Sequence, residues 1–486
     1  MNPTNHLSRR LILVAAVTVL SHTTITSAQV GYVRKIKGSW FYDPAKDTIP
    51  WNPQDNKHGP DYDIPDDPWK VAADQRIDKY RKRNLTIRIV DSAGHPVKNV
   101  PVKIELVRHH FLWGAVATPT FADGPAGNNK RQYLLKYFNA AGYGMGFKPR
   151  QSPGDVGAGT PNRFQEVMAQ ELPWLLKHDF YVRGHNLVWE GARFLHRSQQ
   201  RVLRDERLSD AEKGEKIFSM AANHFHYAIK RWDVDCWDVI NEPRANHVIN
   251  DLLPDKNTFV EWFRLAGELR KQYGRPNVKL FYNEYQIISH VFNRYAQYRD
   301  NYMGHIQDLI DAGAPIEGIG FQYRMKKYVP PETQWKRLQE FEKFGLPFQA
   351  TEFEVMGDKE KAQRNLPTFS DAERKKITAE CMTIFFSHPL ADGFWHWSWT
   401  DRQQPSRTHF PYALMSWEGE PRAEMEQWMK MMERDFNTDV TRETDADGTA
   451  RVRGFKGIYK ITVGKGKDAK TAVVKLEEDT HKELSL

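Results

Sequence analysis

Short apolar segments of strand character alternate with amphipathic helical segments through most of this 486-residue chain. The tips of the strand-like segments lie near positions 185, 242, 284, 322, 352 and 397, and several of these segments end in polar residues. Short buried strands that alternate regularly with helices indicate a parallel sheet. About eight such units over roughly 330 residues match the size of a closed (β/α)8 barrel. An open doubly wound sheet is the structural alternative, but it requires a glycine-rich first turn that the sequence lacks.

The apolar periodicity also places individual elements. It predicts helices over residues 212–231, 257–272, 293–312, 332–343, 371–387 and 422–435. It predicts strands over 181–189, 237–241, 279–284, 316–322, 347–352 and 393–397, preceded by an apolar run at 111–117. We therefore assign residues 111–436 to the barrel.

The chain begins with features of a secretory signal. Arg9 and Arg10 precede a short apolar run, and Thr26-Ser27-Ala28 provides a suitable cleavage site. Residues 1–28 are therefore expected to be removed, and the protein is expected to be secreted, periplasmic or held at the cell surface. Residues 29–84 are rich in proline, aspartate and tryptophan, and we expect an irregular strap that lies on the barrel.

Strand-like segments also flank the barrel. Residues 85–110 contain two alternating runs around a Gly/Pro turn, which predicts a β-hairpin prelude. Residues 437–486 contain short alternating runs separated by turn signals, which predicts a small antiparallel β domain. Sugar binding and passive spacing are both open as the role of this C-terminal domain.

Composition excludes several classes of partner. The net charge of +8 is scattered without a basic stripe, so no nucleic acid is expected. No segment is apolar enough to span a membrane, and HExxH, CxxC and GxSxG motifs are absent, so neither a metal nor a cofactor is expected. Cys236 and Cys381 are expected to be buried free thiols, and the protein is expected to be a monomer.

Two glutamates stand at strand ends that should share one rim. Glu242 follows an apolar strand directly and precedes Pro243, which cannot continue a parallel strand because it has no N–H to donate. Glu352 ends a strand about three units later. Two opposed carboxyl groups about 5 Å apart are the equipment of a retaining glycosidase, with one as a proton donor and the other as a nucleophile. The alternative for Glu242 is a first-turn acid in a helix.

These strand ends carry motifs that together resemble glycoside hydrolase family 10, the family of endo-β-1,4-xylanases. The resemblance covers roughly residues 78–436 and rests on six ordered motifs, which are Arg183-Gly-His-Asn-Leu-Val-Trp, Trp237-Asp-Val-Ile-Asn-Glu-Pro, Leu280-Phe-Tyr-Asn-Glu-Tyr, Ile316-Glu-Gly-Ile-Gly-Phe-Gln, Thr351-Glu-Phe-Glu and Trp397-Ser-Trp-Thr-Asp.

The resemblance implies a retaining endo-xylanase with xylan, a β-linked polysaccharide, as its substrate. It implies that Glu242 is the acid/base, that Glu352 is the nucleophile, and that Asn241 hydrogen-bonds the sugar 2-hydroxyl. It also implies that the remaining substrate contacts come from Lys148, His185, Trp189, Asn283, Gln322 and Trp397. Further aromatic residues that could stack on sugar or pack inward are Tyr282, Tyr285, Tyr323, Trp395 and Trp399.

The first departure from the family concerns the nucleophile. Arg324 stands where the family usually has a histidine, and Glu354 stands where it has an aspartate. We predict that Arg324 bridges Glu352 and Glu354, because a guanidinium has a longer fork than an imidazole and stays charged at any working pH. The alternative is that Arg324 points to solvent.

The second departure concerns the substrate. Gly144 and Met145 replace the family's Glu-Asn on the second strand, and Glu190 replaces a histidine. Lost hydrogen bonds to sugar hydroxyls weaken selectivity. A decorated xylan, another β-glycan such as a glucan or mannan, and a carbohydrate-binding protein without catalysis therefore stay open beside unbranched xylan.

Overall fold

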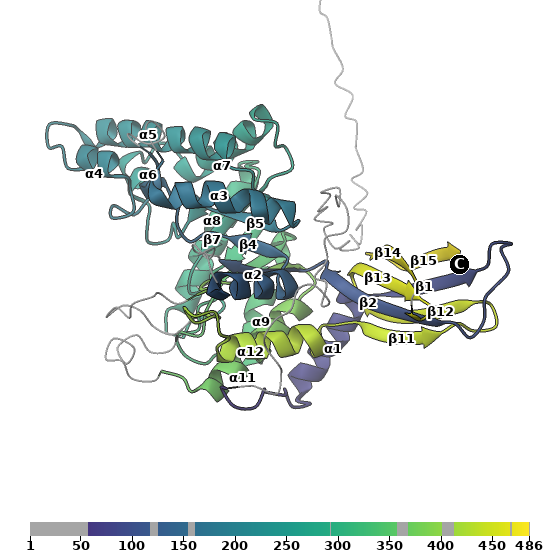
Figure 1. Cartoon of the computed structure of the whole chain (residues 1–486). Coiled ribbons are helices and arrows are strands. Elements are labelled where there is room, and N and C mark those ends of the chain that lie inside the picture. The colour runs from purple at the N-terminus through teal and green to yellow at the C-terminus, as the bar shows by residue number, and fades with distance from the viewer. Residues whose placement is uncertain are drawn as a thin grey trace, which may run out of the picture.

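A closed barrel of eight parallel strands forms the centre of the protein (Figure 1). The computed structural model describes residues 57–116, 125–153, 161–291, 293–356, 368–400, 413–466 and 469–485, so the expected signal and residues 29–56 of the strap lie outside the described residues. The barrel strands are β3 (Leu112–Val116), β4 (Ala140–Gly142), β5 (Tyr181–Val188), β6 (Cys236–Asn241), β7 (Lys279–Glu284), β8 (Gly318–Phe321), β9 (Phe348–Phe353) and β10 (Ala391–His396).

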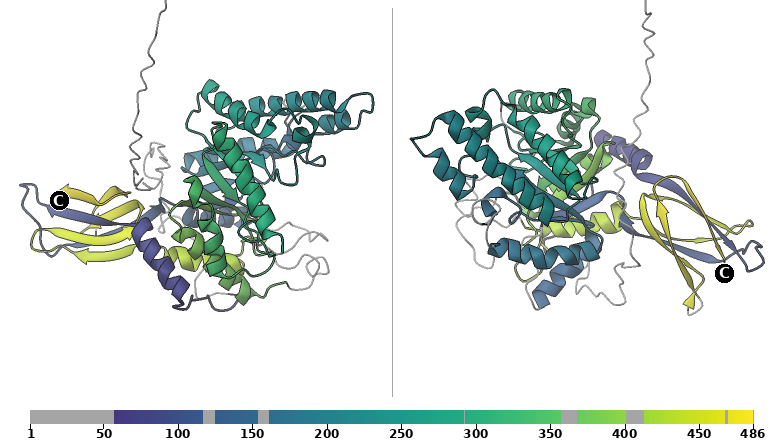
Figure 2. Two further views of the ribbon diagram at one scale, coloured as in Figure 1. Left: turned by 180° about the vertical axis from the view of Figure 1, so that it is seen from behind. Right: turned by 90° about the horizontal axis from the view of Figure 1, so that it is seen from above.

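Each barrel strand pairs in parallel with the next, and β10 closes the ring against β3. Helices surround it, as Figure 2 shows from two further directions. The helices are α1 (Pro68–Arg81), α2 (Pro125–Tyr137), α3 (Arg163–Lys177), α4 (Arg197–Leu203), α5 (Asp210–Arg231), α6 (Val248–Leu252), α7 (Thr258–Gln272), α8 (Tyr295–Asp311), α9 (Pro331–Gln339), α11 (Asp371–Ser387) and α12 (Ala423–Lys430), which a π-helical turn extends over Met431–Asp435. The predicted (β/α)8 barrel is confirmed.

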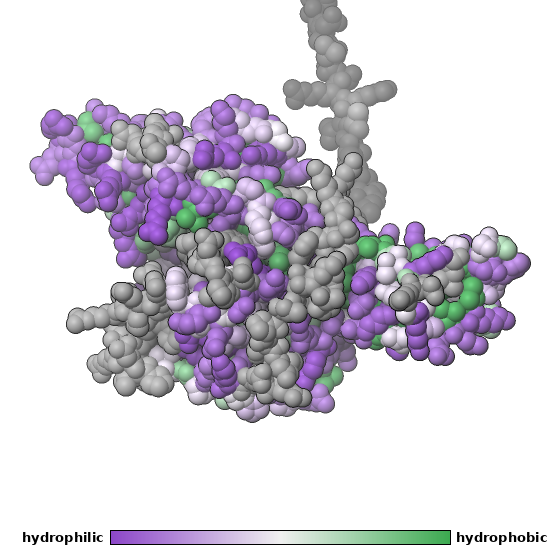
Figure 3. Space-filling view, in the orientation of Figure 1, coloured by the Kyte–Doolittle hydropathy of each residue, from purple (hydrophilic) through white to green (hydrophobic). Residues whose placement is uncertain are grey.

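Local sequence explains why these elements form. Every residue of β6 and of β9 is buried, as expected for strands covered by helices on one face and by the barrel interior on the other. Ser209 and Ser370 each begin a helix with a reciprocal capping box, which satisfies free backbone N–H groups at the helix start. In Figure 3, hydrophilic residues cover most of the visible face, so the surface helices turn their polar sides outward.

The floor of the barrel is a layer of side chains from several strands. It contains Leu112, Ala140, Tyr181, Cys236, Phe281 and Trp395. Trp395 fits because Gly114 and Gly393 leave room for its ring, since a Cβ at either position would lie within 2.3 Å of an indole atom. Trp395 is therefore a core residue and not a sugar platform. Cys236 and Cys381 are both free and buried, as predicted.

The strands outside the barrel form one two-sheet module. One sheet has the order β12–β1–β15 and the other β11–β2–β13–β14. The N-terminal strands are β1 (Lys82–Val90) and β2 (Pro101–His109), and the C-terminal strands are β11 (Asp439–Glu443), β12 (Thr449–Phe455), β13 (Gly457–Val463), β14 (Lys470–Leu476) and β15 (Thr480–Ser485). Leu85 and Ile87 of one sheet share a core with Ile104 and Ile461 of the other.

This arrangement corrects the expected hairpin. The predicted strands exist, but β1 pairs with β12 and β15, whereas β2 pairs with β11 and β13. The turn between them carries the chain from one sheet to the other. Alternation identifies a half-buried strand, but its pairing partner depends on contacts distant in sequence. The N-terminal and C-terminal segments therefore lie side by side in one module (Figures 1 and 2).

Helix α1 corrects the expectation that residues 29–84 have no regular structure. Pro68 stands at the first position of the helix, where its missing N–H costs nothing. Trp69, Ala73 and Ile77 are buried along one face, and their four-residue spacing was a readable signal. Before α1, residues 57–67 run along α12, where Gln427 and Lys430 hydrogen-bond the backbone of Tyr62.

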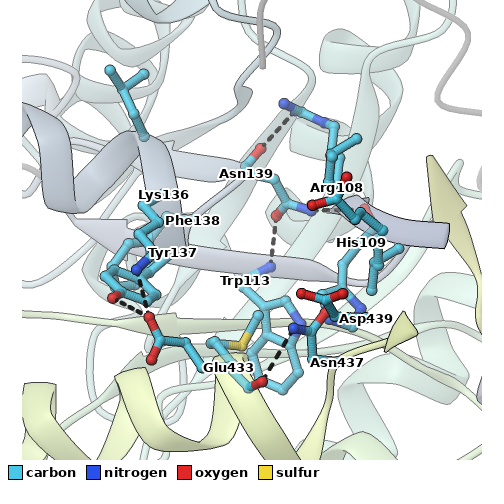
Figure 4. Close-up of a pocket in the computed structure, with 15 residues that line it drawn as sticks. Arg108, His109, Trp113, Lys136, Tyr137, Phe138, Asn139, Glu433, Asn437 and Asp439 are labelled. Carbon is cyan, nitrogen blue, oxygen red and sulfur yellow. Dashed lines mark hydrogen bonds and ion pairs between the residues drawn. The ribbon is translucent and has the colours of Figure 1, made fainter. Parts of the chain in front are cut away.

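A pocket of about 320 Å³ lies where the β module meets the barrel (Figure 4). Glu433 accepts hydrogen bonds there from Lys136 and Tyr137, and Arg108 of β2 donates to the backbone oxygen of Asn139. Asn139 precedes β4, so the pocket lies at the amino ends of the barrel strands, away from the rim that carries the two glutamates. Among the described residues, no helix is long and apolar enough to cross a membrane.

Candidate active site

Glu242 stands at the carboxyl end of β6. Its φ of +54° turns the chain out of the sheet before Pro243, and its backbone N–H still donates to Asn283 at 2.9 Å. Gln322 Nε2 donates to Glu242 Oε1 at 2.6 Å, and Asn246 Nδ2 lies 3.4 Å from Oε2. Burial, and then the negative charge of Glu352, raise the pKa of Glu242. This environment favours the protonated form that a general acid requires.

Glu352 of β9 lies at the same rim in a different environment. Its carboxyl group is 3 % exposed. Asn283 Nδ2 donates to Oε1 at 3.2 Å, and two nitrogens of Arg324 donate to Oε2 at 3.2 and 2.5 Å. His185 Nε2 lies 3.9 Å from Oε1. These contacts stabilise a carboxylate, which is the form that a nucleophile requires.

Arg324 bridges Glu352 and Glu354, as predicted. Its Nη1 donates to Glu354 at 2.6 Å, while its other nitrogens bind Glu352. Arg324 and Glu354 also form a parallel backbone bridge beyond the ends of β8 and β9. Burial acts to lower the pKa of Arg324, but the carboxylates of Glu354 and Glu352 outweigh it and raise that pKa above its ordinary value. The cation is therefore held in place by two anions.

Two asparagines connect the strands that carry the glutamates. Asn283 Nδ2 donates to Asn241 Oδ1 at 2.9 Å as well as to Glu352. Thr351 Oγ1 donates to Asn283 Oδ1 at 2.7 Å and thereby orients this amide. Asn241 Nδ2 is buried and has no hydrogen-bond partner among the residues that the structure describes. A buried donor without a partner is costly unless a ligand supplies an acceptor.

The wall on the Glu352 side is formed by Lys148, His185, Trp189 and Trp397. Lys148 Nζ lies 4.9 Å from the ring centroid of Trp189 and 5.5 Å from that of Trp397. His185 Nδ1 bonds Asp238 at 2.8 Å, and its ring meets Trp397 edge-on at 5.2 Å. Burial lowers the pKa of Lys148, with Glu352 opposing the shift. The structure thus brings the residues proposed for this wall together.

Trp189 is half-buried, and an aromatic ring covers one of its faces. Phe194 stacks on it at a centroid distance of 3.4 Å, and Lys148 lies near it.

The Glu190 carboxyl accepts from Trp262 Nε1 at 2.6 Å and from the backbone N–H of Asn250 at 3.1 Å. Burial raises the pKa of Glu190 to about 7. Glu190 is thus bound within the helical layer, away from the rim.

On the other side of Glu242 lies a pocket of about 690 Å³. Gln322 and Tyr285 line it, and so do the charged side chains of Arg193, Arg324 and Lys326. Among the aromatics left open by the sequence, Tyr285 lines this pocket, whereas the others are buried, namely Tyr282, Tyr323, Trp395 and Trp399. Within the described residues, no group of three or more metal-ligating side chains occurs.

Two supporting residues were missed by the sequence interpretation. Asp238 is fully buried, and it pairs with His185 and with the buried Arg183. A charged residue inside an otherwise apolar strand was the available signal for Asp238. Ser398 donates its hydroxyl to Glu354, and its place in the Trp397-Ser-Trp-Thr-Asp motif was the available signal.

Comparison with known proteins gives one family match. The model for glycosyl hydrolase family 10 matches residues 159–420. Endo-1,4-beta-xylanase B of Thermotoga neapolitana is 24% identical over 337 residues, which are 65% of this chain and 86% of that protein. The anti-sigma-I factor RsgI6 of Acetivibrio thermocellus is 25% identical over 411 residues, which are 82% of this chain and 47% of that protein.

Endo-1,4-beta-xylanase A of Halalkalibacterium halodurans is 28% identical over 196 residues, which are 37% of this chain and 46% of that protein. The chain therefore spans about half the length of two of these three relatives. A solved structure from Paenibacillus barcinonensis, described as a family 10 protein, has a TM-score of 0.52 at 16% identity and covers 67% of this chain and 95% of its own. This likeness is in the fold.

Proposed function

The chain belongs to glycosyl hydrolase family 10, and on this premise we propose that it is a retaining endo-glycosidase that hydrolyses β-1,4-xylosidic bonds in xylan. The observation that carries the proposal is that two glutamates at one rim have different surroundings. Glu242 has a raised pKa, whereas Glu352 accepts hydrogen bonds from Arg324 and Asn283. Double displacement requires this division into a proton donor and an anionic nucleophile.

The reaction would take place in two steps, formation of a covalent glycosyl-enzyme intermediate and its hydrolysis. In the first, Glu352 attacks the anomeric carbon while Glu242 gives its proton to the departing glycosidic oxygen, which leaves a glycosyl ester on Glu352. In the second, Glu242 takes a proton from water, the water oxygen attacks the anomeric carbon, and the Glu352 carboxylate departs. Two inversions restore the original configuration.

The neighbouring polar groups suit a sugar between the glutamates. Asn241 Nδ2 offers its unused hydrogen bond to the 2-hydroxyl, beside Glu352. Gln322 holds Glu242, and Asn283 links Asn241 to Glu352. The remaining contacts would come from Lys148, His185, Trp189 and Trp397 on the glycone side.

Stereochemistry and product analysis test the proposal. Proton NMR of xylo-oligosaccharide cleavage should show the β-anomer first, and its later mutarotation to the α-anomer. The α-anomer appearing first would contradict a retaining mechanism. Reducing-sugar assays on xylan, β-glucan and mannan should show the highest rate on xylan, with Glu352→Ala as the inactive control.

Two observations favour alternatives. Gly144 and Met145, with Glu190 turned away from the rim, leave the glycone side with fewer polar groups, which favours another β-glycan as substrate. One relative is named an anti-sigma factor, which favours a role without catalysis. Turnover of any aryl β-glycoside that is lost in Glu352→Ala would exclude the non-catalytic role.

We further propose that the protein acts as a monomer outside the cytoplasm. The support for export is the signal-like segment at residues 1–28. Amino-terminal sequencing of the exported protein should begin at Gln29, and light scattering should give the mass of one chain. An intact signal on exported protein would contradict the cleavage.

A further inference from the structure

The pocket beside Glu242 has an unusual charge for a site that would receive neutral sugars. Apart from the phenol of Tyr285, four ionisable side chains of the described residues line it, and three of these are the cations Arg193, Arg324 and Lys326. The fourth is Glu242, which carries no charge in the protonated form that protonates a leaving group. In the state ready for reaction, the charged groups among these lining residues are therefore all positive.

The three cations differ in how they are held. Arg324 is engaged by Glu352 and Glu354, so its charge is balanced by two anions. Arg193 is exposed, and its guanidinium lies 4.4 Å from the ring centroid of Phe194. Within the described residues, the close side-chain contact of Arg193 is with this ring and not with a carboxylate. Lys326 is half-buried and makes an interaction of its own, so the exposed Arg193 is the more accessible of these two cations.

Barrel order places the two cations on either side of the acid. The strands β5, β6, β7 and β8 follow one another around the ring. Arg193 follows β5, Glu242 follows β6, and Lys326 follows β8. The aromatic stack of Phe194 on Trp189 fixes the base of Arg193 relative to the glycone wall. A polysaccharide running from that wall past Glu242 would meet positive charge on both sides of the pocket.

We propose that Arg193 and Lys326 make this pocket selective for xylan that carries uronic acid side groups over neutral xylan. Guanidinium and ammonium groups bind carboxylates through charge-assisted hydrogen bonds, and a cleft of one charge sign concentrates ligands of the opposite sign. This inference rests on the proposed function, and it specifies the substrate class of the same site.

The test compares two polymers that differ only in charge. Glucuronoxylan is assayed beside the same preparation after chemical reduction of its carboxyl groups to alcohols. At low ionic strength, the wild-type protein should show about tenfold higher kcat/KM on the acidic polymer, which corresponds to about 1.4 kcal/mol. Added salt should lower this ratio, because the Debye length falls to about 10 Å at 0.1 M.

Variants locate the source of the preference. In the Arg193→Gln/Lys326→Gln double variant, the ratio of acidic to reduced polymer should fall close to one. Lys327→Gln is the matched control, because it removes an exposed charge next to Lys326 from a residue outside the pocket lining, and its ratio should equal that of wild type. If the double variant does not fold, each single variant and the salt series give the same comparison.

The outcomes separate this inference from the proposed function. Equal kcat/KM on both polymers, or a ratio that survives in the double variant, would overturn the inference while xylan hydrolysis stands. Failure of the wild-type protein to cleave either polymer would overturn both. A preference that disappears both in the double variant and at high salt would support the assignment of Arg193 and Lys326.

Discussion

The surroundings of Glu242 and Glu352 differ although both side chains end strands of one barrel. Glu352 accepts hydrogen bonds from Arg324 and Asn283. Glu242 accepts from the neutral amide of Gln322, and burial is the main cause of its raised pKa. The same functional group is thus paired with a cation at one position and with a neutral amide at the other. The difference teaches that the placement of one cation, Arg324, makes the surroundings of two carboxyl groups at one rim unequal.

Glu352→Ala should have the largest effect. Removal of the nucleophile should lower kcat by at least about 10,000-fold, as for other enzymes that lose a covalent nucleophile. Steady-state hydrolysis of an aryl β-xyloside measures this effect. Glu206→Ala, which removes an exposed loop glutamate, should retain wild-type activity. A fall of less than about 100-fold would assign the nucleophile elsewhere.

Glu242→Gln should come second. Loss of the general acid should lower kcat on xylan by about 1,000-fold but spare aryl substrates whose leaving group needs no proton. Activity requires protonated Glu242, so wild-type kcat/KM should fall as pH rises through its pKa. Because this pKa is raised, the fall should occur at a higher pH than for an ordinary glutamate. A basic limb that persists in Glu242→Gln would contradict the assignment.

Arg324→Met should lower kcat by about 100-fold, because it leaves two buried carboxyl groups without their shared cation. Arg324→Lys should recover part of this loss, since it restores charge but not the fork. In Arg324→His, the acidic limb of the pH profile of kcat/KM should move to higher pH, because the permanent positive charge is gone. An unchanged acidic limb would count against the bridge.

Asp392→Asn should have the smallest effect, and on stability alone. Burial raises the pKa of Asp392, in β10, to about 7. The folded protein therefore keeps a proton that the unfolded chain releases from about pH 4, so this group's contribution to stability falls as pH rises from about 4 to about 7. Asp392→Asn should flatten that part of the profile and stabilise the protein by up to about 4 kcal/mol at pH 8.

Chemical denaturation at pH 4 and pH 8 measures the effect of Asp392→Asn. Equal effects of the substitution at both pH values would contradict the raised pKa. This prediction sharpens the comparison between the two rim glutamates, because Asp392 is a third buried carboxyl group with no proposed role in catalysis. A raised pKa at that position would show that burial alone can keep a carboxyl group protonated, in contrast to Glu352, whose carboxyl group is paired with Arg324.

Much of the barrel was readable from local pattern. The predicted helix over 371–387 coincides with α11, and the predicted strand over 279–284 coincides with β7. Such agreement is expected because apolar periodicity reports directly which faces are buried. Glu242 and Glu352 were readable for the same reason, since each follows an apolar strand whose end is marked in the sequence.

Contacts distant in sequence were not readable in the same way. The alternation of apolar and polar residues predicted the strands β1 and β2. We expected these two strands to pair with each other as a hairpin, whereas each pairs with C-terminal strands. Trp395 and Glu190 lie beside motifs typical of a sugar site, yet they pack into the barrel floor and the helical layer. A side chain's direction depends on the space that its neighbours leave, as Gly114 leaves it for Trp395.

The sequence by itself determined the order of strands and helices, the family, and the residues at the strand ends, because burial periodicity and motifs are local properties of the chain. Only the tertiary structure decided that Arg324 contacts both Glu352 and Glu354, that the strands before and after the barrel build one β module, and that Arg193 and Lys326 line the pocket beside Glu242. These are meetings of residues far apart in sequence, and barrel closure brings them together.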